Sequence, residues 1–110
     1  MPGAYPALDR TAAIDFGDDG PLGPFSAELS FSSADQTVTF LVTRGSLLGV
    51  TGTVPFAAQE VADGVWLATW QEPGNLTVVQ VQNFRTGLLL SANVNEAHEL
   101  AHINGSIRLT

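Results

Sequence analysis

The sequence predicts an all-β protein, a small antiparallel up-and-down β-barrel of about eight strands. Apolar and polar residues alternate in short runs, and the turn-forming residues Gly, Asn, Asp and Pro recur between these runs. No segment has the spacing of a long amphipathic helix, so no helix is available to cover an open sheet. A meander of short strands that closes on itself removes exposed strand edges, and we therefore expect a closed barrel.

The composition fits a single barrel domain over residues 1–110. Hydrophobic residues make up 45% of the 110 residues and charged residues 14%, which suits a packed core and not a disordered chain. No apolar run approaches the roughly 18 residues of a membrane span, and the N-terminus lacks the features of a secretion signal. We therefore expect a cytoplasmic protein with no membrane partner.

Charge and missing residue types exclude several classes of function. The formal net charge of -7 argues against nucleic acid as a partner. All four basic residues are arginines, and the absence of lysine excludes Schiff-base and P-loop chemistry. The absence of cysteine excludes disulfides, thiolate nucleophiles and cysteine-ligated metals. No cofactor is expected.

The first half of the chain is predicted to form an N-terminal arm followed by three strands. In order, the predicted segments are an extended arm over residues 1–8, strands over 11–16, 25–31 and 37–43, and a loop or bulged strand over 45–52. Alternate positions of the second and third strands form apolar faces, which consist of Phe25, Ala27, Leu29, Phe31, Val38, Phe40 and Val42. Arg44 continues the face of the third strand and could point into the barrel mouth.

The second half contains the clearest hairpin of the sequence. The predicted strands cover residues 53–61, 64–72, 75–84, 88–94 and 101–109, and Pro55 makes the first of them an edge, a bulge or a late start. Pro73-Gly74 is a turn by its chemistry. If Glu72 lies opposite Asn75, the pairing puts Trp66 and Trp70 on one face with Thr77, Val79 and Val81. The opposite, outer face then carries Gln71, Gln80 and Gln82.

This hairpin resembles a known family motif. Gly64–Gly74 followed by Thr77–Phe84 is similar to the Trp-x-Glu hairpin of the molybdenum-cofactor biosynthesis protein F family, the MoaF-like proteins, and of its single-domain relatives. The same turn resembles that of the phenolic acid decarboxylases, which are lipocalin-like (calycin) barrels. The resemblance implies a lipocalin-like barrel over about residues 23–110.

In the decarboxylases the glutamate of the motif is catalytic, which implies Glu72 as the matching residue. Their site also uses tyrosines of the first strands and an arginine of a middle strand. The only tyrosine here is Tyr5 in the predicted arm, and the stretch that would carry the arginine reads Leu47-Leu48-Gly49-Val50. We therefore do not expect the same decarboxylation.

A barrel of about eight strands can enclose one small ligand, and the sequence offers candidates for such a site. The predicted ligand-binding residues are Phe31, Phe40, Arg44, Trp66, Trp70 and Glu72. A carboxyl group in apolar surroundings suits a general acid or base, so Glu72 is also the candidate catalytic residue. The alternatives are that Glu72 begins a solvated turn, that the two Trp fill the core, and that Arg44 is a strand-end residue in water.

His98 to His102 spells H-E-x-x-H, the zinc-protease helix motif. That chemistry needs a helix, whereas His102 lies in an alternating strand pattern, where residues four apart are about 13 Å apart. We expect no metal site from this motif, and leave open whether either histidine binds a metal by itself.

Three functions are compatible with these observations. The first is a barrel that binds a small apolar or aromatic molecule in its interior. The second is an enzyme on the same scaffold, a cofactor-free lyase, isomerase or cyclase that uses Glu72. The third is a barrel filled by its own side chains that acts as a homodimeric interaction module. The barrel alone does not decide among them, because one fold hosts binders and enzymes alike.

Overall fold

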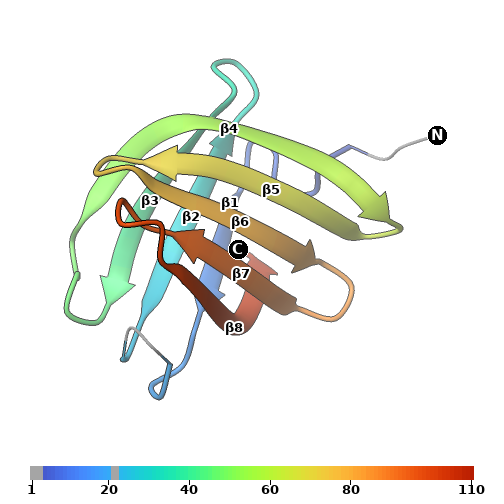
Figure 1. The fold of residues 1–110 in the computed structure, drawn as a ribbon. Coiled ribbons are helices and arrows are strands. Elements are labelled where there is room, and N and C mark those ends of the chain that lie inside the picture. The colour runs from blue at the N-terminus through green and yellow to red at the C-terminus, as the bar shows by residue number, and fades with distance from the viewer. Residues whose placement is uncertain (1–3, 21–22) are drawn as a thin grey trace.

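The computed structural model describes residues 4–20 and 23–110, and these residues form a closed antiparallel barrel (Figure 1). Within them lie eight strands: β1 (Thr11–Asp15), β2 (Ser26–Ser32), β3 (Thr37–Arg44), β4 (Thr51–Ala62), β5 (Val65–Glu72), β6 (Leu76–Asn83), β7 (Leu88–Val94) and β8 (Leu100–Leu109). The predicted all-β, up-and-down barrel is confirmed. No helix that could span a membrane occurs among the described residues.

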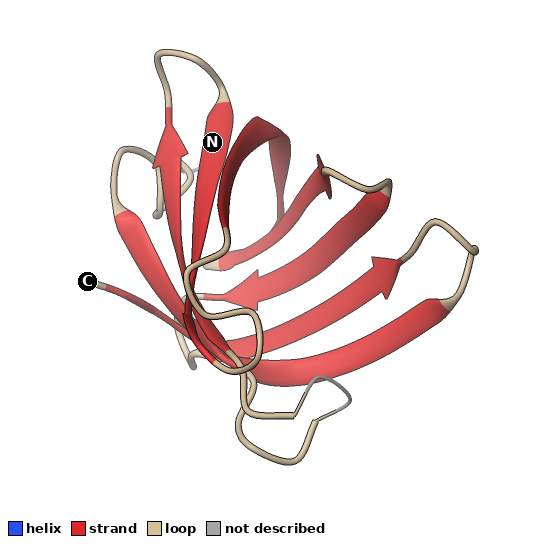
Figure 2. Cartoon of the chain, turned by 90° about the vertical axis from the view of Figure 1, so that its left-hand side faces the viewer, coloured by secondary structure: helices blue, strands red, loops and turns tan. Residues whose placement is uncertain are grey.

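Each strand pairs with its neighbours in the chain, and β1 closes the barrel against β8 from Ala12↔Leu109 to Asp15↔Ser106. Figure 2 shows the strands curving around one common interior. Gly105 lies next to the last β1–β8 pair, where the two strands are very close. A Cβ at this position would collide with the backbone carbonyl of Asp15. The glycine therefore allows the two strands to approach each other closely.

The connections alternate between two ends of the barrel. The β1–β2, β3–β4, β5–β6 and β7–β8 loops lie at one end, which we call the mouth, and the other connections lie at the opposite end, the closed end. The less exposed residues recur at every second position along the strands. In β2, Ala27, Leu29 and Phe31 are buried, and in β4 half-buried residues alternate with exposed ones. The inward faces predicted for residues 25–31 and 37–43 are confirmed.

Pro55 lies inside β4, although proline is rare in paired strands. It occupies the last position of the pairing with β3, opposite Thr37, while the pairing with β5 begins one residue later at Phe56↔Trp70. The backbone N–H of Phe56 donates to the Gln36 carbonyl, 3.1 Å away, so the next N–H bond is made in the usual way. The proline is tolerated because one ladder ends and the other begins at this point.

The register predicted for the β5–β6 hairpin is wrong by one residue. Glu72 pairs with Leu76, so Trp70 lies opposite Val78 and Trp66 opposite Gln82. Asn75, with φ 60°, adopts the left-handed conformation and extends the Pro-Gly turn to a three-residue loop. A shift of one residue moves every side chain of a strand to the other face. Gln80 and Gln82 therefore point into the barrel, 2% and 0% exposed, and not outward as predicted.

The N-terminal segment differs from the extended arm expected over residues 1–8, of which residues 1–3 lie outside the described part. Residues 4–8 turn over the closed end, where the Leu8 N–H donates to the Tyr5 carbonyl and the Asp9 N–H to the Phe31 carbonyl. Tyr5 is 7% exposed, and its ring packs edge-on against Phe31 with centroids 5.1 Å apart. Residues 4–8 therefore cover this end of the barrel, and the Tyr5 ring fills the space inside it.

Candidate ligand-binding site

The interior contains a cavity of about 470 Å³, which we call the lumen, and it opens at the mouth. Its walls come from the inward faces of β1, β2, β3, β5, β6, β7 and β8, and its rim comes from loop residues that include Leu47, Val50, Asn95 and Glu99. The volume lies within the range of roughly 300–1,000 Å³ typical of small-molecule sites. The lumen is therefore large enough for one small organic molecule.

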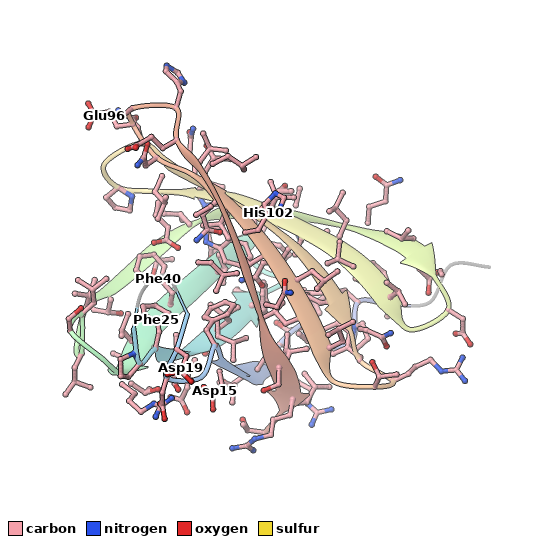
Figure 3. The ribbon with its side chains drawn as sticks, turned by 60° about the horizontal axis from the view of Figure 1, so that its bottom comes forward. Asp15, Asp19, Phe25, Phe40, Glu96 and His102 are labelled. Atoms are coloured by element: carbon pink, nitrogen blue, oxygen red, sulfur yellow. The ribbon has the colours of Figure 1, made fainter. Side chains whose placement is uncertain are left out.

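Most of the wall is apolar. The larger apolar lining residues are Ile14, Phe16, Phe25, Leu29, Phe40, Val42, Trp70, Leu76, Val78 and Ile103. Phe25 and Phe40 lie inside the ring of strands near the β1–β2 loop (Figure 3). The Phe40 ring lies over Gly52 of the neighbouring strand, where a Cβ would come within 2.7 Å of the ring. Gly52 thus leaves the space that sets the position of this ring.

The polar part of the wall lies on β6 and β7. Gln80 pairs with Ser91 across these strands, and Val78 pairs with Asn93. The Ser91 hydroxyl donates to Asn93 Oδ1 at 2.8 Å, which leaves the Asn93 amide NH₂ without a protein partner among the described residues. Sequence reasoning missed Gln80 because the predicted hairpin register placed it outside, and it missed Ser91 and Asn93 because it assigned no inner face to residues 88–94.

A chain of hydrogen bonds connects this polar strip to the closed end. The Tyr5 hydroxyl donates to Gln82 Oε1 at 2.5 Å, and Gln82 Nε2 donates to Gln80 Oε1 at 2.9 Å. Each of these hydrogen bonds is accepted by the side-chain oxygen of the next glutamine. Gln80 Nε2 therefore remains as a donor at the floor of the lumen. Buried amides are stable in an apolar core only when they are paired in this way.

Glu72 ends β5 at the mouth and lines the lumen. Its Oε2 accepts a hydrogen bond from the indole N–H of Trp70 at 3.0 Å. Burial raises the pKa of the Glu72 carboxyl above its ordinary value, and the indole N–H partly offsets this effect. The two predicted site residues are thus brought together, with the carboxyl group held against the aromatic wall.

Trp66 and Phe31 do not line the lumen. They belong to an aromatic cluster at the closed end, where the Trp66 and Tyr5 ring centroids are 5.2 Å apart. Phe56 and Phe84 complete this cluster around Tyr5. The sequence assigned both residues to the inner face, which is correct, but it could not say at which depth of the barrel they lie.

Arg44 lies outside the lumen. A bulge in the pairing of β2 with β3, between Ser26 and Ala27, turns the end of β3 outward. The guanidinium then pairs with Asp18 at 2.6 Å and with Asp15 at 3.3 Å, on the outer side of the mouth. The side chain is 44% exposed, which fits the alternative of a strand-end arginine in water.

The two histidines of the H-E-x-x-H sequence are not on a helix. His98 lies in the β7–β8 loop with φ 62°, and His102 lies in β8, where Figure 3 labels it. In the described part of the chain, no group of three or more His, Asp or Glu side chains has the arrangement of a metal site. The helix that this motif requires is not formed, because its five residues cross from the β7–β8 loop into β8.

Comparison with known proteins gives a family and a fold. The family model of the MoaF-like proteins matches residues 19–108. A crystal structure from Burkholderia vietnamiensis, described as a "putative beta-lactamase", superposes with a TM-score of 0.84 at 23% sequence identity, covering 99% of this chain and 100% of the other. No curated protein matches the chain.

Proposed function

This chain belongs to the MoaF-like family, and we propose that its barrel binds one small, mostly apolar molecule in the lumen. The observation that carries the proposal is the cavity of about 470 Å³, with Trp70 and Phe40 in its walls. A site of this kind gains affinity from apolar contact and orientation from a few polar groups. Glu72, Gln80 and Asn93 are the polar groups that would orient the ligand.

The cavity favours this function over a barrel filled by its own side chains. The closed end is filled, because Tyr5 and the aromatic cluster occupy it. The mouth half is not filled in the same way, although the residues that line it are largely apolar and could have packed together. Apolar side chains that line a cavity open to water leave surface unburied, which forgoes roughly 25 cal/mol per Å² of stabilisation, so a wall of this kind needs a reason to stay unpacked. A bound ligand supplies that reason.

The Burkholderia neighbour does not extend this proposal to β-lactam hydrolysis. At 23% identity the likeness supports the fold alone. The serine in the lumen, Ser91, donates its hydroxyl proton to an amide oxygen of Asn93 and not to a base. A serine nucleophile needs an adjacent base such as lysine or histidine, and this chain has no lysine.

The test is to fill the lumen and measure binding. Ala101 lies on the inner face of β8 and lines the lumen, so Ala101→Phe places a ring inside it. Two probes that share a naphthalene body, 2-naphthalenemethanol and 2-naphthylmethylamine, are titrated by calorimetry. Native mass spectrometry of the untagged protein shows in addition whether a molecule is retained from the cell.

We expect Ala101→Phe to weaken probe binding by at least about tenfold, or about 1.4 kcal/mol. Ala92→Phe is the matched control, because Ala92 pairs with the outward-facing His102 and lies on the outer face of β7. The control should bind as the unmodified protein does. If neither probe binds, or if Ala101→Phe and Ala92→Phe behave alike, the proposed function is wrong.

A second candidate is proton transfer by Glu72 to or from the bound molecule. The observation that favours it is the position of this carboxyl group in the wall of the lumen, held by the Trp70 N–H, where burial also raises its pKa. Glu72→Gln keeps an acceptor for the Trp70 N–H but removes the titrating proton. Loss of turnover with retained binding in this variant would establish catalysis, and equal behaviour of both proteins would exclude it.

A further inference from the structure

We propose that the lumen selects a cationic ligand, an apolar body that carries a protonated amine, with the ammonium group placed against the Glu72 carboxylate. This inference rests on the proposed function and adds the charge of the ligand to it. It stands on three features of the mouth and lumen: the charges that line them, the position of Glu72, and the unused donors of the polar strip.

The first feature is the absence of a basic side chain from the lumen lining. Among the described residues that form the lumen, the charged ones are Glu72 and Glu99, and both are acidic. Arg44 is the arginine nearest to the mouth, and its guanidinium is engaged outside by Asp15 and Asp18. A carboxylate or phosphate ligand would therefore enter a site with no partner for its charge, which is costly in a partly desolvated cavity.

The mouth as a whole is acidic. The acidic residues around it are Asp15, Asp18, Asp19, Glu72, Glu96 and Glu99, which lie on β1, the β1–β2 loop, β5 and the β7–β8 loop. Figure 3 shows Asp15 and Asp19 on one side of this end and Glu96 on the β7–β8 loop at the other side. Such a distribution attracts cations and repels anions on approach.

The second feature is that Glu72 is a preorganised acceptor. The indole N–H of Trp70 binds Oε2 and so fixes the carboxylate at the wall of the lumen. An ammonium group beside it would be paired with a charge and would also lie near aromatic rings, since Trp70 and Phe40 line the same space. Both kinds of contact favour a cation over a neutral group of the same size.

The third feature, the unused donors of the polar strip, indicates which group the ligand carries at the end opposite its amine. Gln80 is 2% exposed and its Nε2 has no protein partner among the described residues, while its Oε1 is taken by Gln82. Asn93 likewise keeps an amide NH₂ free, because its Oδ1 is taken by Ser91. These donors lie deeper in the barrel than Glu72 does, by the register of β5, β6 and β7. A ligand that satisfies them carries a hydrogen-bond acceptor at the end opposite its amine.

The experiment compares three probes with the same naphthalene body and different head groups. These are 2-naphthylmethylamine, 2-naphthalenemethanol and 2-naphthoate, titrated by calorimetry at neutral pH and low salt into the full chain. We expect the amine to bind at least about tenfold more tightly than the carboxylate, with the alcohol between them. In Glu72→Gln the advantage of the amine over the alcohol should disappear.

The control for charge is Glu28→Gln. Glu28 lies between the buried residues Ala27 and Leu29 of β2, so it faces outward, and the variant changes the net charge by the same amount. It should keep the preference for the amine. Carboxylate binding as tight as that of the amine, or a preference that survives in Glu72→Gln, overturns the inference but leaves lumen binding standing. Failure of all three probes to bind overturns the proposed function itself.

Discussion

At the scale of single residues, Gly52 makes room for the Phe40 ring in the wall of the lumen. A Cβ at position 52 would lie 2.7 Å from Phe40 Cζ and 3.1 Å from Cε1, so the ring would have to move. We expect Gly52→Ala to lower the free energy of unfolding by about 1–3 kcal/mol through overpacking. The displaced ring should also narrow the lumen and weaken binding of the naphthalene probes.

Urea denaturation and calorimetry measure these two effects. Gly20→Ala serves as the control, because a Cβ there would meet its nearest atom, the Phe16 carbonyl oxygen, at an ordinary 3.6 Å. It should change neither stability nor binding appreciably. Unchanged probe affinity in Gly52→Ala would show that the Phe40 ring does not limit the lumen.

Tyr5 is the residue whose titration reports on the closed end. Burial raises the pKa of its hydroxyl group above the ordinary value, although its hydrogen bond to Gln82 acts in the opposite direction. A pKa that is higher in the folded than in the unfolded state gives stability that is fully present below about pH 10 and declines as the pH rises above it. The folded protein should therefore resist tyrosinate formation until it unfolds.

This is measurable because the chain has a single tyrosine. Absorbance near 295 nm and urea denaturation are followed together from neutral to alkaline pH. Tyr5→Phe should be about 1–3 kcal/mol less stable at neutral pH, since Gln82 loses a buried donor. The stability of Tyr5→Phe should depend less on pH above about 10 than that of the unmodified protein. The two curves of unfolding free energy against pH should therefore converge. If Tyr5 titrates with an ordinary tyrosine pKa in the folded protein, the burial of its ring at the closed end is wrong.

At the scale of elements, the β5–β6 turn decides which side chains enter the barrel. Asn75 takes φ 60°, a conformation that asparagine and glycine adopt more readily than other residues. We expect Asn75→Ala to cost about 1 kcal/mol of stability and Asn75→Gly to be nearly neutral. Urea denaturation of the pair provides the comparison, and equal losses in both variants would mean that the asparagine side chain, and not its backbone conformation, stabilises the turn.

The same turn explains why the sequence predicted the hairpin but not its faces. The alternation of residues 64–84 and the Pro-Gly pair located both strands correctly. A two-residue and a three-residue turn differ only in whether Asn75 joins the loop, and the sequence permits both. An inward Val79 and Val81 would have given an apolar inner face, but the structure puts Gln80 and Gln82 there. Gln82 is bonded to Tyr5 and to Gln80, and the Gln80 NH₂ group faces the lumen without a protein partner among the described residues.

At the scale of the whole molecule, charge is distributed unevenly between the two ends. Arg85 pairs with Asp63 at 2.8 Å at the closed end, whereas the mouth gathers six of the 11 acidic residues of the chain, namely Asp15, Asp18, Asp19, Glu72, Glu96 and Glu99. If the lumen takes a cation, binding of 2-naphthylmethylamine should weaken several-fold between about 10 mM and 0.5 M salt. Binding of 2-naphthalenemethanol should change little. An equal salt response of the two probes would show that the acidic mouth does not act on the ligand.

Features that depend on local patterns could be predicted from the sequence alone. The period of two and the spacing of turn residues specified the strands, their order specified a meander, and the removal of exposed edges favoured closure; the Trp-x-Glu hairpin indicated the family. Features that depend on contacts between distant segments emerged only from the three-dimensional structure. The depth of Trp66 and Phe31 follows from the stagger of strands around the barrel, the outward position of Arg44 follows from a bulge against β2, and the role of Tyr5 follows from a buried partner 77 residues away. A side chain's alternation is local, but its depth, register and partner are set by the strand beside it, and for that reason they appeared only in the folded barrel.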